Sequence, residues 1–241
     1  ELKTLRAVER LPGTRPRNRR WDGTEGVLTF DELLLLLAAE SRRLNRRVGL
    51  HAELKDATRL AALGLDLEGA VLAVLRDHGL DERGSGVHLQ SFEPSCLHRL
   101  REQTDLRLVQ LVESSGAPAD LVAAGDPTTY DDLVSPHGLR SVARYADSVA
   151  LSKSRLLGDP TDAAALVDHA HLSGLRVLAW TLRDENRFLA ARFRRGDEPE
   201  RRGDSARELA ALLDAGVDGV FCDHPDTALA ARDAWRRVRV G

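Results

Sequence analysis

Methionine is absent from these 241 residues, and cysteine and aromatic residues are scarce. The chain opens on Glu1, so we expect further residues to precede it in the full protein. Aromatic side chains form only 4% of the sequence, which argues against the stacking platforms that bind single-stranded nucleic acids. Cys96 and Cys222 follow no CxxC pattern, and two free thiols are favoured over a disulfide.

The sequence also lacks a surplus of positive charge, because 35 basic residues face 38 acidic ones and leave a net charge of −3. This balance argues against a basic nucleic-acid-binding face, and we expect no nucleic-acid partner. The longest apolar run, 33–39, is too short to cross a bilayer, so no transmembrane segment is predicted. Hydrophobic residues still form 42% of the chain, enough for a sizeable core in one domain over residues 1–241.

Residues 1–28 show no sustained period and contain breakers such as Pro12-Gly13 and Pro16, which predicts a loop or a small insertion. The arginines of this segment are expected to form a solvated surface, with phosphate contact as the alternative; they are Arg15, Arg17, Arg19 and Arg20. Thr29 and Glu32 then have the spacing of a capping box, which predicts a helix start.

Short aliphatic runs alternate with helical patterns over the rest of the chain. The expected strands are 47–53, 87–92, 106–112, 148–151, 177–181 and 217–223. The expected helices are 30–45, 69–78, 94–103, 138–145, 162–173, 206–214 and 227–236. Gly79, Gly174 and Gly216 stand where left-handed residues would end three of these helices.

Strands that alternate with helices pair in parallel through crossovers, which leaves an open doubly wound sheet or a (β/α)₈ barrel. No glycine-rich dinucleotide loop follows the first strand, because Gly84-Ser85-Gly86 precedes a strand. Polar residues collect at the carboxyl ends of the strands, where barrel enzymes build their sites. We therefore expect an α/β fold of the TIM-barrel type whose first two βα units are absent from this chain.

Glu53 and Lys55 close the first strand, and period-2 alternation points both side chains toward the barrel mouth. A carboxylate there can bind a hard divalent cation, and a lysine beside it can neutralise a phosphate oxygen. A simple Glu–Lys ion pair is the alternative. His51 shares the face of Glu53, which leaves a role near a metal open.

The other strand ends carry polar or aromatic groups, none of which completes a site alone. They are Gln90, Ser91, Gln110, Glu113, Lys153, Trp180, Arg183, Asp223 and His224. An interior glutamine is more often a satisfied layer residue than a ligand. Trp180 is predicted either to wall a substrate pocket or to fill the core.

Four motifs in order resemble the glycerophosphodiester phosphodiesterase family. They are Gly49-Leu50-His51-Ala52-Glu53-Leu54-Lys55, Val87-His88-Leu89-Gln90-Ser91-Phe92-Glu93-Pro94, Ala179-Trp180-Thr181-Leu182-Arg183-Asp184-Glu185-Asn186, and the segment from Gly216 to Asp226. The segment between Tyr130 and Asp147 resembles the bacterial secreted or periplasmic branch of the family.

This resemblance implies a barrel that hydrolyses small glycerophosphodiesters to sn-glycerol 3-phosphate and an alcohol with a divalent cation. Glu53 falls on the family's metal-ligand glutamate and Lys55 on the lysine beside the substrate phosphate, and we expect Trp180 to contact substrate. The oxygen ligand and the secreted-like branch favour Ca²⁺ over Mg²⁺ and an extracytoplasmic location. The oligomeric state is left open.

The family's His-Arg-Gly, Glu-x-Asp and His-Asp motifs do not occur in this sequence. We therefore expect no catalytic histidine in this chain, because the two that serve as general acid and base would lie upstream of Glu1. The 241-residue chain alone is then expected to be nearly inactive. The alternatives are a related phospholipase-like phosphodiesterase, or a non-catalytic barrel remnant that acts as a binding protein.

Overall fold

The computed structural model describes residues 1–240 and shows a single parallel sheet of six strands. The strands follow one another in the sheet in chain order: β1 (Leu50–Glu53), β2 (Val87–Ser91), β3 (Arg107–Val112), β4 (Ser148–Ser152), β5 (Arg176–Leu182) and β6 (Gly219–Cys222). Parallel neighbours need a crossover connection, and helices supply each one. Because every crossover advances by one strand, the order is that of a barrel and not of a doubly wound sheet.

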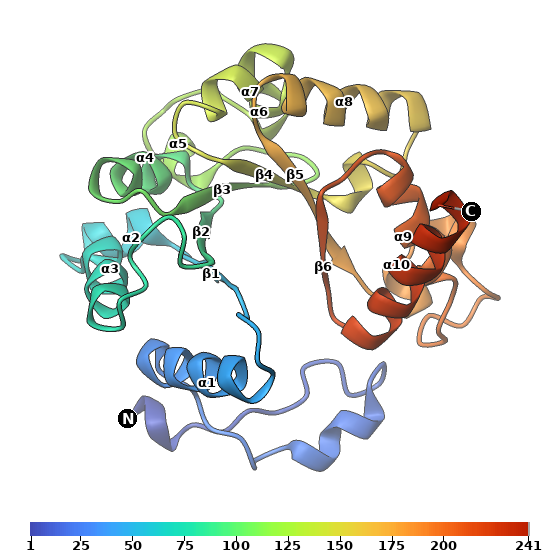
Figure 1. Cartoon of the computed structure of the whole chain (residues 1–241), viewed down its shortest axis with the longest axis horizontal. Helices are drawn as coiled ribbons and strands as arrows, with labels where there is room; N and C mark the ends of the chain where they lie inside the picture. The colour runs from blue at the N-terminus through green and yellow to red at the C-terminus, as the bar shows by residue number, and fades with distance from the viewer. Residues whose placement is uncertain (241) are drawn as a thin grey trace.

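The helices lie along the outer side of the sheet, and the sheet curls into an arc (Figure 1). They are α2 (Ala57–Ala62), α3 (Leu67–Asp77), α4 (Pro94–Gln103), α5 (Ala119–Ala123), α6 (Tyr130–Val134), α7 (Pro136–Val142), α8 (Pro160–Leu172), α9 (Ser205–Asp214) and α10 (Pro225–Val240). A further helix, α1 (Phe30–Arg43), lies apart from this layer (Figure 1). Within the described residues β1 pairs only with β2 and β6 only with β5. The sheet is therefore an open half-barrel.

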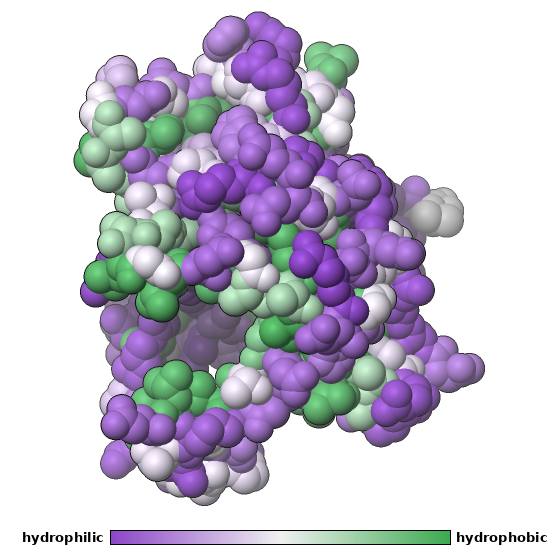
Figure 2. All heavy atoms as spheres, turned by 90° about the vertical axis from the view of Figure 1, so that its left-hand side faces the viewer, coloured by the Kyte–Doolittle hydropathy of each residue, from purple (hydrophilic) through white to green (hydrophobic). Residues whose placement is uncertain are grey.

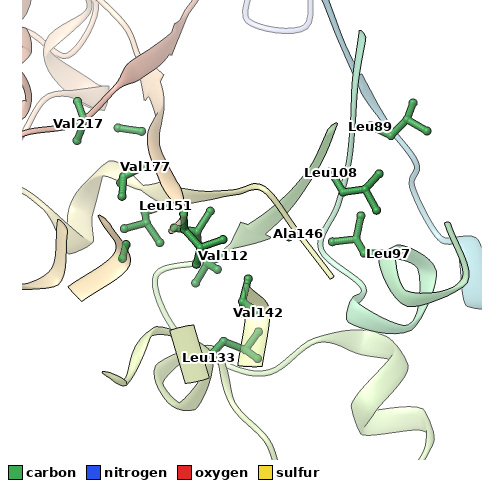
Figure 3. Packing of buried hydrophobic residues seen from close by; sticks show 14 of the residues in the cluster. Leu89, Leu97, Leu108, Val112, Leu133, Val142, Ala146, Leu151, Val177 and Val217 are labelled. Atoms are coloured by element: carbon green, nitrogen blue, oxygen red, sulfur yellow. The ribbon is translucent and has the colours of Figure 1, made fainter. Parts of the chain in front are cut away.

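Two layers of apolar side chains hold this half-barrel together. The larger layer lies between the outer face of the sheet and the helices, where strand residues such as Leu108 and Leu151 pack near Leu97 and Val142 (Figure 3). The smaller layer lies on the inner face, where Val109, Leu111 and Ala150 form a buried cluster. Strands covered on both faces read as continuous aliphatic runs, which explains the sequence of β3 and β4.

Residues 1–28 form two short 3₁₀ helices, Leu2–Thr4 and Pro16–Trp21, joined by irregular chain. This segment and α1 lie across the open side of the arc (Figure 1). α1 begins at the predicted capping box, in which Thr29 and Glu32 each accept a backbone N–H of the other residue. Figure 2 shows a hollow between this lower block and the body of the molecule, bordered by hydrophobic residues.

Large apolar side chains remain exposed on this lower block. They include Leu2, Leu5, Trp21, Leu28, Leu35 and Leu36, each with at least half of its surface accessible. A contiguous exposed apolar surface is uncommon on a domain that has no further partner. No described helix combines the length and the hydrophobicity that crossing a bilayer would require.

The structure confirms all six predicted strands, and Gly79, Gly174 and Gly216 have the positive φ predicted for helix ends. Both cysteines are free thiols, as expected. Several boundaries and elements differ from the prediction. β1 and β6 are shorter than predicted, the predicted helix 138–145 spans Pro136–Val142, and α2, α5 and α6 were not predicted. These three unpredicted helices have only five or six residues each, too few to show a helical period.

Candidate active site

A cavity of about 510 Å³ lies at the carboxyl ends of the strands. Its charged and polar lining comes from Glu53, Lys55, Gln90, Glu113, Thr181, Arg183 and Asp223, and its apolar lining from Phe92, Leu111, Trp180, Phe221 and Cys222. Carboxyl ends of parallel strands meet at one edge of a curled sheet, so residues far apart in the sequence converge here. The structure thus brings the sequence-predicted residues Glu53, Lys55 and Trp180 to one cavity.

Glu53 and Lys55 form an ion pair at this edge, with 2.5 Å between Nζ of Lys55 and Oε1 of Glu53. Glu53 is the last residue of β1, and its backbone pairs in register with Gln90 of β2. Most of the Lys55 side chain is exposed, at 70%, whereas the Glu53 side chain is 23% exposed. Oε2 of Glu53 has no hydrogen-bond partner among residues 1–240, and Glu53 is one of the residues that line the cavity.

Trp180 both packs in the apolar interior and lines the cavity. Its Nε1 donates to the carbonyl oxygen of Ala150 at 3.1 Å, and its ring meets that of Phe92 edge to face at 5.7 Å between centroids. The ring therefore packs on the inner apolar cluster and also lines the cavity. The hydrogen bond and the ring contact fix the indole in one orientation.

His51 lies two positions before Glu53 on β1 and does not line the cavity. Its ring stacks on that of His88 with 4.3 Å between centroids, and Nδ1 lies 3.3 Å from Oε1 of Gln90. Burial lowers the pKa of His51 below its ordinary value. This histidine therefore supports the inner layer instead of joining Glu53.

Three other polar residues predicted at strand ends use their polar groups in hydrogen bonds or an ion pair within the fold. Ser91 donates to the carbonyl oxygen of Leu54 and stabilises the end of β1. Gln110 is fully buried and bonds to backbone carbonyls and to the hydroxyl of Tyr145. Lys153 pairs with the buried carboxylate of Glu208 at 2.5 Å. These are satisfied structural residues.

An ion-pair network closes one side of the cavity. Oδ2 of Asp223 accepts from Nε of Arg183 and from Nη2 of Arg15, each at 2.9 Å, and Arg15 also donates to Glu185 at 2.6 Å. Burial tends to raise the pKa of Asp223, but the hydrogen bond from Arg15 and the charge of Arg183 outweigh it and lower that pKa. The same competition lowers the pKa of Glu185. His224 sits beside the network, with Nε2 3.7 Å from Glu185.

The expectation of a solvated loop is wrong for Arg15, whose side chain is only 20% exposed. Its partners lie about 170 and 208 positions away in the sequence, so no local pattern shows this pairing. Arg17, Arg19 and Arg20 are exposed, as predicted.

Glu53 is the one cavity residue that the sequence assigned to a metal. Within the described part of the chain, no group of three or more His, Cys, Asp or Glu side chains is placed to hold an ion. A Ca²⁺ ion takes six to eight oxygen ligands. The carboxylates that line the cavity are not grouped closely enough to complete such a site within residues 1–240.

The model of the glycerophosphoryl diester phosphodiesterase family matches residues 1–227. The chain belongs to this family. Among curated relatives, glycerophosphodiester phosphodiesterase GDPD6 of Arabidopsis thaliana is 27% identical over 92% of the chain, and the Haemophilus influenzae glycerophosphodiester phosphodiesterase is 25% identical over 87%. The chain spans 59% of the length of each of these two relatives.

A solved structure from Silicibacter pomeroyi DSS-3, assigned to the same phosphodiesterases, has the same fold. It superposes with a TM-score of 0.59 at 23% identity and covers 89% of this chain and 61% of its own. The half-barrel thus has the same fold as the matched part of that structure.

The cavity of this family member includes residues that sequence reasoning had not assigned to a site. Phe92 and Phe221 lie two positions from Gln90 and from Gly219 on the inner face, so alternation along β2 and β6 was a signal for them. Thr181 stands among the polar residues at the predicted end of the fifth strand, whereas Cys222 gave no such signal. Cys222 packs mainly on the outer side, against the cluster around Leu209.

Proposed function

We propose that the protein containing this chain hydrolyses glycerophosphodiesters to sn-glycerol 3-phosphate and an alcohol with the help of a divalent cation. The observation that carries this proposal is the placement of Glu53, Lys55 and Trp180 around one cavity at the catalytic end of a half-barrel. Family membership supports it independently.

Glu53 is proposed as one metal ligand, because it lines the cavity and its Oε2 has no hydrogen-bond partner among residues 1–240. A bound cation would offset negative charge on phosphoryl oxygens and polarise the phosphorus. The remaining ligands would come from residues outside this sequence. Carboxylate oxygen suits Ca²⁺ and Mg²⁺, and we propose Ca²⁺ together with an extracytoplasmic location, on the resemblance to the secreted branch.

Lys55 is proposed to bind a non-bridging phosphoryl oxygen. Its ammonium group is largely exposed, carries three donors, and gives only one of them to Glu53. Trp180 is proposed to pack against the glycerol carbons, since its orientation is fixed and its ring lines the same cavity. Gln90 adds an amide that can bind a hydroxyl group.

No histidine lines the cavity within residues 1–240. General acid–base help is worth ~10²–10⁴-fold, so the isolated chain is expected to be nearly inactive. We propose that two further βα units carry these groups and fill the gap between β6 and β1. The unpaired edges of both strands and the exposed leucines of α1 support that completion.

The test is hydrolysis of glycerophosphocholine by the full-length protein, followed through release of glycerol 3-phosphate. The 241-residue chain is assayed beside it, and lysophosphatidylcholine serves as the alternative substrate. The proposal predicts turnover of glycerophosphocholine by the full-length protein and a loss of at least ~100-fold in the isolated chain. Equal turnover by both proteins would refute the placement of the acid and base outside this chain. Preference for the lysolipid would favour a phospholipase-like enzyme.

A further inference from the structure

We propose that Arg183 binds the phosphoryl group of the substrate from the β5 side of the cavity, as a second cation besides Lys55. The proposal deepens the proposed function and rests on it for the identity of the substrate. Arg183 directly follows β5, whereas Lys55 follows β1 at the other end of the sheet. Both residues line the same cavity.

Arg183 is held in place by contacts that leave most of its donors free. Its Nε donates to Asp223 at 2.9 Å, and its guanidinium lies over the ring of Phe188 with 4.6 Å between Cζ and the centroid. A guanidinium has five N–H donors, and Asp223 takes one. The two terminal nitrogens of Arg183 have no hydrogen-bond partner anywhere in residues 1–240.

Such an arginine is suited to phosphate chemistry. Its planar fork can donate two parallel hydrogen bonds to two phosphoryl oxygens, which an ammonium group cannot do. The side chain is 28% exposed, so it is reachable by a ligand while partly shielded from solvent. Within the described lining of the cavity, Lys55 and Arg183 are the two cationic side chains.

Arg15 acts on this site as a positioning residue. Oδ2 of Asp223 accepts from both Arg15 and Arg183, so Asp223 is anchored from the far side by Arg15. Arg15 in turn is fixed by Glu185. The orientation of Arg183 therefore depends on a residue in the N-terminal segment.

The test compares the full-length wild type with Arg183→Gln, Arg183→Lys and a control, Arg187→Gln. Arg187 lies over the same Phe188 ring at 5.5 Å, is exposed, and does not line the cavity. Three quantities are measured: KM and kcat for glycerophosphocholine, calorimetric binding of inorganic phosphate, and the melting temperature.

We expect Arg183→Gln to raise KM and to weaken phosphate binding by the same factor, ~10- to 100-fold, because a charge-assisted hydrogen-bond pair is lost. Arg183→Lys should restore part of that loss, since it keeps the charge without the fork. Arg187→Gln should stay within ~2-fold of wild type in both quantities.

Unchanged KM and phosphate binding in a folded Arg183→Gln protein would overturn the proposal. If Arg183→Gln does not fold, Arg183→Lys provides the test. Wild-type affinity of Arg183→Lys for inorganic phosphate would exclude a bidentate role of Arg183. Failure of the proposed function is a separate outcome. A wild type that binds phosphate through Arg183 but cleaves no glycerophosphodiester would refute the reaction and leave the arginine site standing.

Discussion

Arg15 and Asp223 lie 208 residues apart in the chain, yet Nη2 of Arg15 donates to Oδ2 of Asp223 at 2.9 Å. This bond ties the N-terminal segment to the end of the last strand, on the open side of the half-barrel. Arg15 also pairs with Glu185, whose side chain is only 5% exposed. The two bonds thus hold the N-terminal segment against the carboxyl ends of β5 and β6.

Replacing Arg15 by Gln should destabilise the fold by about 3 kcal/mol, because the buried carboxylate of Glu185 loses its charged partner. Urea unfolding of the 241-residue chain measures this loss. The matched control is Arg17→Gln, which changes an exposed arginine two positions away, in the short helix Pro16–Trp21, and should cost no more than about 0.5 kcal/mol. Equal stability of the two variants would show that the ion pair contributes nothing.

Gln110 should matter for stability and not for substrate binding. Its side chain is fully buried, donates to the carbonyl oxygens of Phe92 and Leu111, and accepts from the hydroxyl of Tyr145 at 2.8 Å. Gln110→Leu leaves the two carbonyl oxygens and the Tyr145 hydroxyl without a hydrogen-bond partner, which should cost about 2–4 kcal/mol in unfolding free energy. Gln103→Leu, at an exposed end of α4, is the control and should change little. A large change in KM with intact stability would contradict this assignment.

Acidification should destabilise the inner layer through His88. Burial lowers the pKa of His88 to about 4, helped by the charges of His51, Arg107 and Arg176 and opposed by Asp147. The unfolded chain then binds a proton near pH 6.5 that the folded one does not. The free energy of unfolding is therefore unaffected by His88 above about pH 6.5 and decreases as the pH falls toward 4.

The size of this effect is about 1 kcal/mol once solvent screening of a half-buried group is allowed for. Unfolding free energies at pH 7 and pH 4.5 measure it in the wild type and in His88→Gln. The variant should lose less stability on acidification. An identical pH dependence in both proteins would place the titrating group elsewhere.

The fold was largely predictable because its central strands, β2 to β4, are buried on both faces. Continuous aliphatic runs such as that around Leu108 stand out from helical stretches with a 3.6-residue period. The short helices α5 and α6 could not be recognised in the sequence, because five residues span little more than one helical turn. Their positions depend on tertiary packing, for instance on Tyr130 against Phe92.

The candidate site was predictable only where local alternation determines direction. Glu53 ends β1 and Lys55 lies two positions later, so the alternation of the extended chain predicted their shared orientation. Arg15 was placed wrongly, because its partners are distant in sequence and an arginine-rich loop usually faces solvent. The pairing of Arg183 with Asp223 likewise required the closure of β5 on β6.

The central claim is that Glu53 supports metal-dependent cleavage of a phosphodiester at this cavity. The most direct measurement is glycerophosphocholine hydrolysis by full-length wild type and Glu53→Gln, before and after treatment with EDTA and with Ca²⁺ or Mg²⁺ added back. The account predicts that EDTA abolishes wild-type turnover, that Ca²⁺ restores it best, and that Glu53→Gln loses at least ~100-fold under every condition. Turnover that survives both EDTA and the substitution would contradict it.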